Sequence, residues 1–169
     1  CIGVDPYYLV HKAKELQYHT KMINSGRYVN DSMGRYIGKK VVKKIISQGK
    51  NILGAHVLVM GMTFKENVSD IRNSKVADII NEFKDFGAEV DVMDPFASPS
   101  EVLREYGIRL VEKPGKPGKK YDAVVVAVAH TTYLKLDESY FMSITNEHAV
   151  LADVKGVYRG SIHQMIYWL

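Results

Sequence analysis

The run Ala123-Val124-Val125-Val126-Ala127-Val128-Ala129 contains only apolar residues. A strand with one buried and one solvent-facing side would show a polar residue at every second position. An unbroken apolar run is instead typical of a central strand in a parallel sheet, because helices cover both faces of such a sheet. We therefore predict a parallel sheet with residues 123–129 near its centre.

The segments around this run alternate between strand-like and helix-like patterns. Residues 52–60 are rich in valine and leucine, residues 74–86 have helical periodicity and end before Gly87, and residues 89–93 again indicate a short strand. Three weaker elements follow the same alternation: a helical turn at 100–106 and strands at 108–111 and 149–153. The sequence thus predicts an α/β fold with a doubly wound, mostly parallel, Rossmann-like sheet.

A long helical segment precedes the sheet in two pieces. Asp5-Pro6 indicates a helix start, with an N-cap carboxylate followed by proline in the first turn. After a break at 17–20, apolar residues recur at three- and four-residue spacing over 22–47, where Asp31 can pair with Arg35 one turn further on. We expect residues 1–49 to form this helical segment and residues 50–169 to form the Rossmann-like domain.

Composition narrows the function classes. The chain has 169 residues and a net charge of +4, and its lysine clusters lack the interleaved aromatic residues or recognition motif of a nucleic-acid-binding protein. No apolar run approaches the roughly 18 residues that span a bilayer. The single cysteine cannot form an internal disulfide, which favours a reducing compartment, and we predict a cytoplasmic protein without a metal site.

The candidate ligand-binding residues lie in loops that follow the predicted strands. In doubly wound sheets, ligands bind beyond the carboxyl ends of the strands. The loop after Met60 holds Phe64, Lys65 and Arg72, and Lys155 follows the strand that ends at Asp153. From pattern alone these cations are as consistent with a solvated surface as with an anion site, because the Gly-x-Gly-x-x-Gly fingerprint is absent. His130, in the loop after residue 129, is more simply a satisfied histidine at a strand end than a ligand.

Cys1 lies just before the first predicted helix, where the unpaired amides of a helix N-terminus stabilise a thiolate. Asp5 opposes this effect, because a nearby carboxylate disfavours a second negative charge. Two simpler alternatives remain open: a lone cysteine is often an inert, buried small residue, and Asp5 is first a helix cap and second a catalytic acid or base.

Two segments together resemble a known family. Cys1-Ile2-Gly3-Val4-Asp5-Pro6-Tyr7-Tyr8-Leu9 looks like the catalytic-cysteine segment of the UDP-glucose/GDP-mannose dehydrogenase family, and Phe64-Lys65 with Asp70-Ile71-Arg72-Asn73-Ser74 looks like its second signature. The resemblance covers nearly the whole chain. It is to the C-terminal, UDP-sugar-binding portion of the family, and Gly3 and Tyr7-Tyr8-Leu9 point to the bacterial UDP-N-acetyl-D-glucosamine/galactosamine 6-dehydrogenase branch.

The resemblance implies a four-electron oxidation of the sugar C6 alcohol to a carboxylate with two NAD molecules in succession. Cys1 matches the nucleophile, which captures the aldehyde as a thiohemiacetal and is then acylated as a thioester that water hydrolyses. Asp5 matches the assisting carboxylate, which orients or deprotonates that water.

The same resemblance assigns the ligand contacts. Phe64 and Lys65 match positions that contact the UDP-sugar, and Arg72 matches a contact to the NAD pyrophosphate. Lys155 falls where many members carry a substrate-binding arginine, and a lysine lacks the bidentate fork of that arginine.

The resemblance also implies that the chain is only part of the enzyme. NAD would be bound mainly by an N-terminal domain upstream of Cys1, so we expect this chain alone to have no dehydrogenase activity. The long helix over 22–47 would contribute to a homodimer interface, and the product would serve surface polysaccharide biosynthesis.

Two other readings stay open from the sequence. The chain could be a nucleotide-binding or dimerisation module without chemistry of its own, or a regulatory domain that senses a UDP-sugar. UDP binding would separate either from an inert scaffold but would not exclude the enzyme.

Overall fold

The structure is a computed structural model that describes residues 3–115 and 119–168. Cys1 lies outside the described residues. The helices are α1 (Asp5–Glu15), α2 (Lys21–Ser47), α3 (Val76–Asp85), α4 (Pro99–Tyr106), the short 3-10 helix η1 (Tyr133–Lys135) and α5 (Glu138–Ile144). The strands are β1 (His56–Met60), β2 (Glu89–Met93), β3 (Tyr121–Val126), β4 (Thr145–Asp153) and β5 (Ile166–Trp168).

The strands form one sheet in the order β2-β1-β3-β4-β5, and every neighbouring pair is parallel. The predicted doubly wound, Rossmann-like architecture is confirmed. Strand β2 lies on one side of β1 and β3 on the other, so the direction of winding reverses between β1 and β3. The carboxyl ends of these two strands therefore mark the switch point at which such sheets bind ligands.

Both faces of the sheet are buried, which explains the unbroken apolar run. In β1, Val57 and Val59 belong to a core shared with α2 and α3, whereas Leu58 and Met60 belong to a second core shared with Phe141 of α5. The same alternation continues in β3 and β4. A polar side chain on either face of these strands would lose its contact with water.

Two predicted strands differ from the structure, and two further elements were not predicted. Strand β3 ends at Val126 rather than at residue 129, because the Ala127 and Val128 amides both donate to the Met60 carbonyl (2.9 and 3.3 Å) and end the regular ladder. The strand predicted at 108–111 is reduced to a single bridge between Val92 and Leu110. Strand β5 and helix α5 were not predicted at all, because each is short and bounded by weak local signals.

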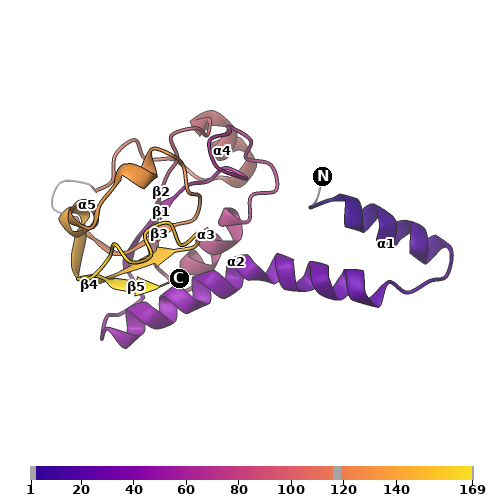
Figure 1. Cartoon of the computed structure of the whole chain (residues 1–169), viewed down its shortest axis with the longest axis horizontal. Helices are drawn as coiled ribbons and strands as arrows, with labels where there is room; N and C mark the ends of the chain where they lie inside the picture. Colours follow the sequence, from indigo (N-terminus) through magenta and orange to yellow (C-terminus); the bar gives the residue numbers. More distant parts are fainter. Residues whose placement is uncertain (1–2, 116–118, 169) are drawn as a thin grey trace.

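Helix α2 connects the sheet to a projecting helical arm (Figure 1). Its second half packs into the core through Val41, Val42 and Ile45, and its first half extends beyond the sheet together with α1. The close approach of α2 to α3 requires glycine, since a Cβ at Gly38 would lie 2.8 Å from the Glu82 Cβ. The division of the chain at residue 49 remains a prediction.

Asp31 joins the arm to the sheet domain. Its carboxylate binds Arg27 (3.1 Å) and Lys75 (3.1 Å) and accepts a hydrogen bond from the Tyr7 hydroxyl. The predicted Arg35 pair is therefore wrong, because helical side chains lean toward the helix N-terminus and bring Asp31 to Arg27 instead. The Tyr7 hydroxyl, with Lys75 and Arg27, holds the pKa of Asp31 below its ordinary value.

Within residues 3–115 and 119–168, no helix combines the length and apolar composition that a membrane crossing requires.

Candidate functional site

The loop that follows β1 begins with a turn that only glycine can make. Gly61 has φ of +97°, and a Cβ there would lie 2.5 Å from the Cβ of Val128. The chain can therefore leave β1 close against the segment that follows β3. The result is that residues 61–75, which carry most of the candidate ligand contacts, start at the switch point of the sheet.

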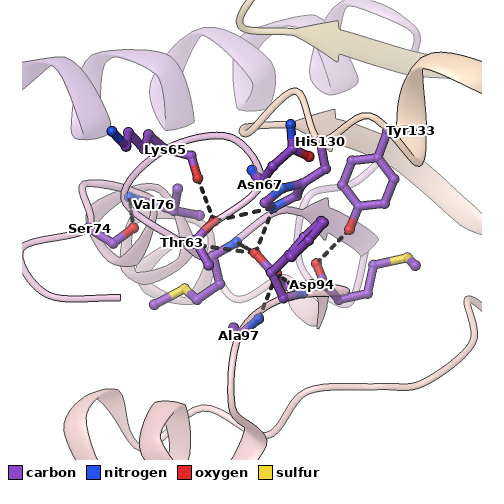
Figure 2. A network of polar contacts seen from close by, with 12 residues as sticks. Thr63, Lys65, Asn67, Ser74, Val76, Asp94, Ala97, His130 and Tyr133 are labelled. Carbon is purple, nitrogen blue, oxygen red and sulfur yellow. Dashed lines mark hydrogen bonds and ion pairs between the residues drawn. The ribbon is translucent and has the colours of Figure 1, made fainter. Parts of the chain in front are cut away.

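Asp94, at the end of β2, organises the start of this loop (Figure 2). One of its oxygens accepts the Met62 and Thr63 amides (2.6 and 3.0 Å), and the other accepts the Phe96 and Ala97 amides (2.7 and 2.9 Å). Burial alone would raise the pKa of Asp94, but these amides outweigh that effect and hold its pKa below the ordinary value. An ionised carboxylate therefore connects the loops after β1 and β2.

Asp153, at the end of β4, plays the same part for the turn that carries Lys155. This fully buried carboxylate accepts the Gly156 and Tyr158 amides (2.9 and 2.7 Å) and the Tyr167 hydroxyl (2.8 Å). The sequence analysis predicted no loop-holding role for either Asp94 or Asp153. A carboxylate directly after a buried strand was the available signal for such a role.

Two adjoining hollows lie beside the loop. The first, of about 380 Å³, is lined by Asp5, Phe64 and Arg72 among others. The second, of about 410 Å³, is lined by Phe64, Lys65, Lys155 and part of α2. Phe64 and Asn73 line both. Five of the six residues selected from the sequence thus meet at one edge of the sheet, and the sixth, Cys1, lies outside the described residues.

The cations of the site differ in how they are held. Lys65 has no ion pair among those found in the described parts of the chain, whereas Lys155 pairs with Glu66 at 3.1 Å. The Glu66 backbone amide, followed by Lys155, lowers the pKa of Glu66. Both Lys155 and Glu66 are partly exposed, so an incoming anion can compete for the lysine at small cost.

Arg72 is exposed and is oriented from within its own loop. Its guanidinium makes two hydrogen bonds to the Asp70 carboxylate (2.9 and 2.7 Å), and the Arg72 backbone amide adds a third (3.0 Å). These contacts lower the pKa of Asp70 to about 2. The remaining guanidinium donors stay free to meet a ligand that approaches from solvent.

Asp5 differs from the sequence prediction in one respect. It is the first residue of α1 rather than its N-cap, which is Val4, and no side chain caps the helix. Its carboxylate is thus not engaged as a cap and lines the first hollow.

Among the residues that the structure describes, no group of three or more His, Cys, Asp or Glu side chains is placed to hold a metal ion.

His130 confirms the expectation of a satisfied histidine at a strand end. Its side chain is fully buried, with Thr63 and Asp94 near one ring nitrogen and the Asn67 amide at the other. Figure 2 shows the ring between the loop after β1 and the end of β2.

A doubly wound parallel sheet with cationic loops at its switch point defines a Rossmann-like domain of the kind that binds nucleotides. Comparison with known proteins makes this class specific. Residues 58–160 match the UDP-binding domain of the UDP-glucose/GDP-mannose dehydrogenase family, and the chain belongs to this family.

Relatives and solved structures agree with this assignment. The chain is 42% identical over 92% of its length to a UDP-N-acetyl-D-glucosamine 6-dehydrogenase from Pseudomonas aeruginosa, and 40% identical over 93% to one from Salmonella typhi. It spans 36% of the length of each. An NDP-N-acetyl-D-galactosaminuronic acid dehydrogenase from Methanosarcina mazei Go1 shares the fold, with a TM-score of 0.85 and 22% identity over 99% of this chain and 37% of that one.

Proposed function

We propose that this chain is the C-terminal part of an NAD-dependent dehydrogenase that oxidises the C6 hydroxyl of a UDP-N-acetylhexosamine to the uronic acid. The observation that carries the proposal is the meeting of Asp5, Phe64, Lys65, Arg72 and Lys155 around two hollows that share Phe64. Family membership and two relatives with UDP-N-acetyl-D-glucosamine 6-dehydrogenase activity in their names support the substrate class.

In this proposal the second hollow receives the UDP-sugar. Lys65, free of any ion pair in the described parts of the chain, neutralises the diphosphate, and the half-exposed Phe64 ring packs against the ligand. Lys155 exchanges its partner Glu66 for a ligand oxygen. As a point charge it can attract the ligand without the bidentate geometry of an arginine.

The first hollow faces the chemistry. Cys1, two positions before Gly3 in the sequence, is the proposed nucleophile that forms the thiohemiacetal and then the thioester, and Gly3 lines this hollow. Asp5 orients or deprotonates the hydrolytic water, which its free carboxylate can do because it caps no helix.

The residues present fit a contact to NAD. Arg72 presents an exposed guanidinium, held in place by Asp70, at the same hollow as Asp5. It would hold the pyrophosphate, and bound NAD would supply the hydride acceptor. Most of the NAD site would come from a domain upstream of Cys1, so this chain alone would be inactive.

Assembly and cellular role are part of the same proposal. Tyr28 and Val29 in the first half of α2, and Tyr36 just past its midpoint, are exposed, and a second copy of the chain would cover them in a homodimer. We place the enzyme in the cytoplasm, where it would supply uronic acids for surface polysaccharide. The alternative is a nucleotide-binding or dimerisation module without chemistry.

Calorimetric titration of this chain with UDP tests the binding half of the proposal. Lys65→Met should weaken UDP binding about tenfold, because a charge-assisted hydrogen bond is lost. Lys84→Met is the matched control, since it removes an exposed lysine at the end of α3. Absence of UDP binding, or equal loss in both variants, would refute the assignment of the site.

The whole protein tests the chemistry. It should form NADH from a UDP-N-acetylhexosamine, and Cys1→Ser should abolish uronate production. Unchanged uronate production by that variant would exclude the covalent mechanism, and a natural reading frame without an NAD-binding domain upstream of Cys1 would favour the non-catalytic module.

A further inference from the structure

His130 contacts the loop after β1 on both sides of its ligand-facing residues. Its Nδ1 lies 3.0 Å from the Asn67 amide nitrogen, and its Nε2 lies 3.2 Å from the Thr63 hydroxyl oxygen. Residues 64–66, which include Phe64 and Lys65, lie between these two points. One buried ring therefore brackets the part of the loop that faces the hollows.

The partners of the ring define its protonation pattern. The Asn67 N–H can only donate, so Nδ1 must accept and carries no proton. The proton of the neutral ring is then on Nε2, which faces the Asp94 carboxylate at 3.1 Å and the Thr63 hydroxyl. The Thr63 hydroxyl itself donates to the Lys65 carbonyl at 3.1 Å, so its oxygen is free to accept. Every donor in this set has an acceptor.

The two contacts of His130 with the loop, called the bracket below, extend to the Lys65 backbone through the Thr63 hydroxyl. Figure 2 shows the Lys65 carbonyl turned toward the Thr63 hydroxyl, while the Lys65 side chain points away from the network. On the other side, Asn67 has φ of +58°, and its side chain accepts from the Thr131 amide (2.9 Å) and hydroxyl (3.1 Å). The loop is thus attached to the segment after β3 at two consecutive residues, 130 and 131.

Besides the partly exposed Lys155–Glu66 pair and the Asn67–Thr131 contacts, side chains hold the loop at its two ends. Asp94 binds the amides at its start, and the Tyr106 hydroxyl donates to the Ile71 carbonyl (2.6 Å) near its end. His130 differs from these partners because its fully buried ring contacts the loop on both sides of residues 64–66. Phe96 covers the ring at a centroid distance of 4.8 Å, and Tyr133 packs edge-on at 5.4 Å, which keeps the ring in one orientation.

We propose that His130 is a positioning residue for the ligand site: it fixes residues 64–66 so that Phe64 and Lys65 are presented to the diphosphate ligand before that ligand binds. The proposal rests on the proposed function, because it assigns a purpose to the order of the loop. Without the bracket, ligand binding would have to order this segment, and that cost would reduce affinity.

Three variants separate the two contacts of the ring. His130→Asn places an amide oxygen near the Nδ1 position and keeps an acceptor for Asn67, whereas His130→Gln reaches the Nε2 position and keeps a donor for Thr63 and Asp94. His130→Phe keeps the aromatic ring and loses both contacts. Tyr133→Phe is the matched control, since it removes a buried hydroxyl from the same layer, which donates to the Met93 carbonyl (3.2 Å), without touching the loop.

Amide hydrogen exchange of the unliganded chain measures the bracket directly, under conditions in which circular dichroism shows every variant folded. Exchange at Asn67 should be about tenfold faster in His130→Phe and His130→Gln, because the Asn67 amide loses its hydrogen-bond acceptor. It should stay near the wild-type rate in His130→Asn and in Tyr133→Phe. A merely structural role would instead raise exchange in all four variants in proportion to their loss of stability.

Titration with UDP then measures the consequence for binding. His130→Phe should weaken UDP affinity by about fivefold or more, while Tyr133→Phe leaves it unchanged. Unaltered exchange at Asn67 in His130→Phe, unaltered UDP affinity in that variant, or equal loss in Tyr133→Phe would each overturn the proposal. A wild-type chain that does not bind UDP would refute the proposed function, and the exchange pattern would then decide by itself whether His130 orders the loop.

Discussion

Replacement of Gly61 by alanine tests whether the close crossing at the switch point is required for the site. The added Cβ would lie 2.5 Å from the Val128 Cβ and 2.8 Å from the Val128 amide nitrogen, and neither atom is the end of a flexible side chain. Overpacking of this kind costs about 1–3 kcal/mol. The positive φ of +97° adds roughly 1–2 kcal/mol for a residue with a Cβ. Part of this is offset, because alanine restricts the unfolded chain by about 0.4–1 kcal/mol.

We therefore expect Gly61→Ala to lower the free energy of unfolding by about 2–4 kcal/mol. Gly54→Ala is the matched control, because Gly54 has a similar positive φ of +76° but no neighbouring atom within 4 Å of an added Cβ. The control should lose no more than about 1–2 kcal/mol.

Urea denaturation followed by circular dichroism measures both losses, and an unchanged m-value would show that the difference lies in stability. UDP titration of the folded variants should show weaker binding for Gly61→Ala alone, since the loop that carries Phe64 and Lys65 starts at this residue. Equal destabilisation of the two variants would show that the Val128 contact is relaxed at no cost, and the reasoning from the crossing would fail.

Three further predictions follow from the packing and charges of the molecule. On α2, Gly26→Ala should stabilise the chain by up to about 1 kcal/mol, because an added Cβ there meets no neighbouring atom. Gly38→Ala should destabilise the chain by about 1–2 kcal/mol, because its Cβ would overlap α3. Thermal unfolding measures both changes, and a gain of stability in both variants would exclude tight packing of α2 against α3. Asp94→Asn should cost about 2–3 kcal/mol near neutral pH. Because the pKa of Asp94 is depressed in the folded protein, this contribution is complete above the unfolded pKa of about 3.9 and is lost as pH falls through the folded pKa. The difference in unfolding free energy between wild type and variant, measured by urea titration, should therefore shrink below about pH 4. A difference that stays constant would contradict an ionised Asp94. Glu66→Gln should change the free energy of unfolding by less than about 1 kcal/mol, since the ion pair with Lys155 is partly exposed. It should tighten UDP binding, because Lys155 is then free to bind the ligand. Weaker UDP binding would show that Glu66 itself contacts the ligand.

Local sequence patterns were sufficient for most of the fold. The apolar run at 123–129 predicted a central parallel strand because both faces of such a strand must be buried, and Gly87 marked a helix end because it adopts a positive φ there. Patterns of this kind record the burial and backbone conformation of each residue. These patterns gave a wrong prediction where hydrogen bonding to a neighbouring strand decides whether a segment forms a strand. At 108–111, a single bridge from Leu110 to Val92 of β2 replaces the predicted strand.

The site divides in the same way. The sequence placed Phe64, Lys65, Arg72 and Lys155 after predicted strands, but charge and position left an anion site and a solvated surface equally open, and these residues were selected through the resemblance to a known family. Only the tertiary structure decided how these residues are held: His130 reaches Asn67 across 63 positions of the chain, and Asp94 reaches Met62 across 32. Hydrogen bonds between such distant residues depend on the order of strands in the sheet, and strand order is a property of the whole chain that no local pattern records.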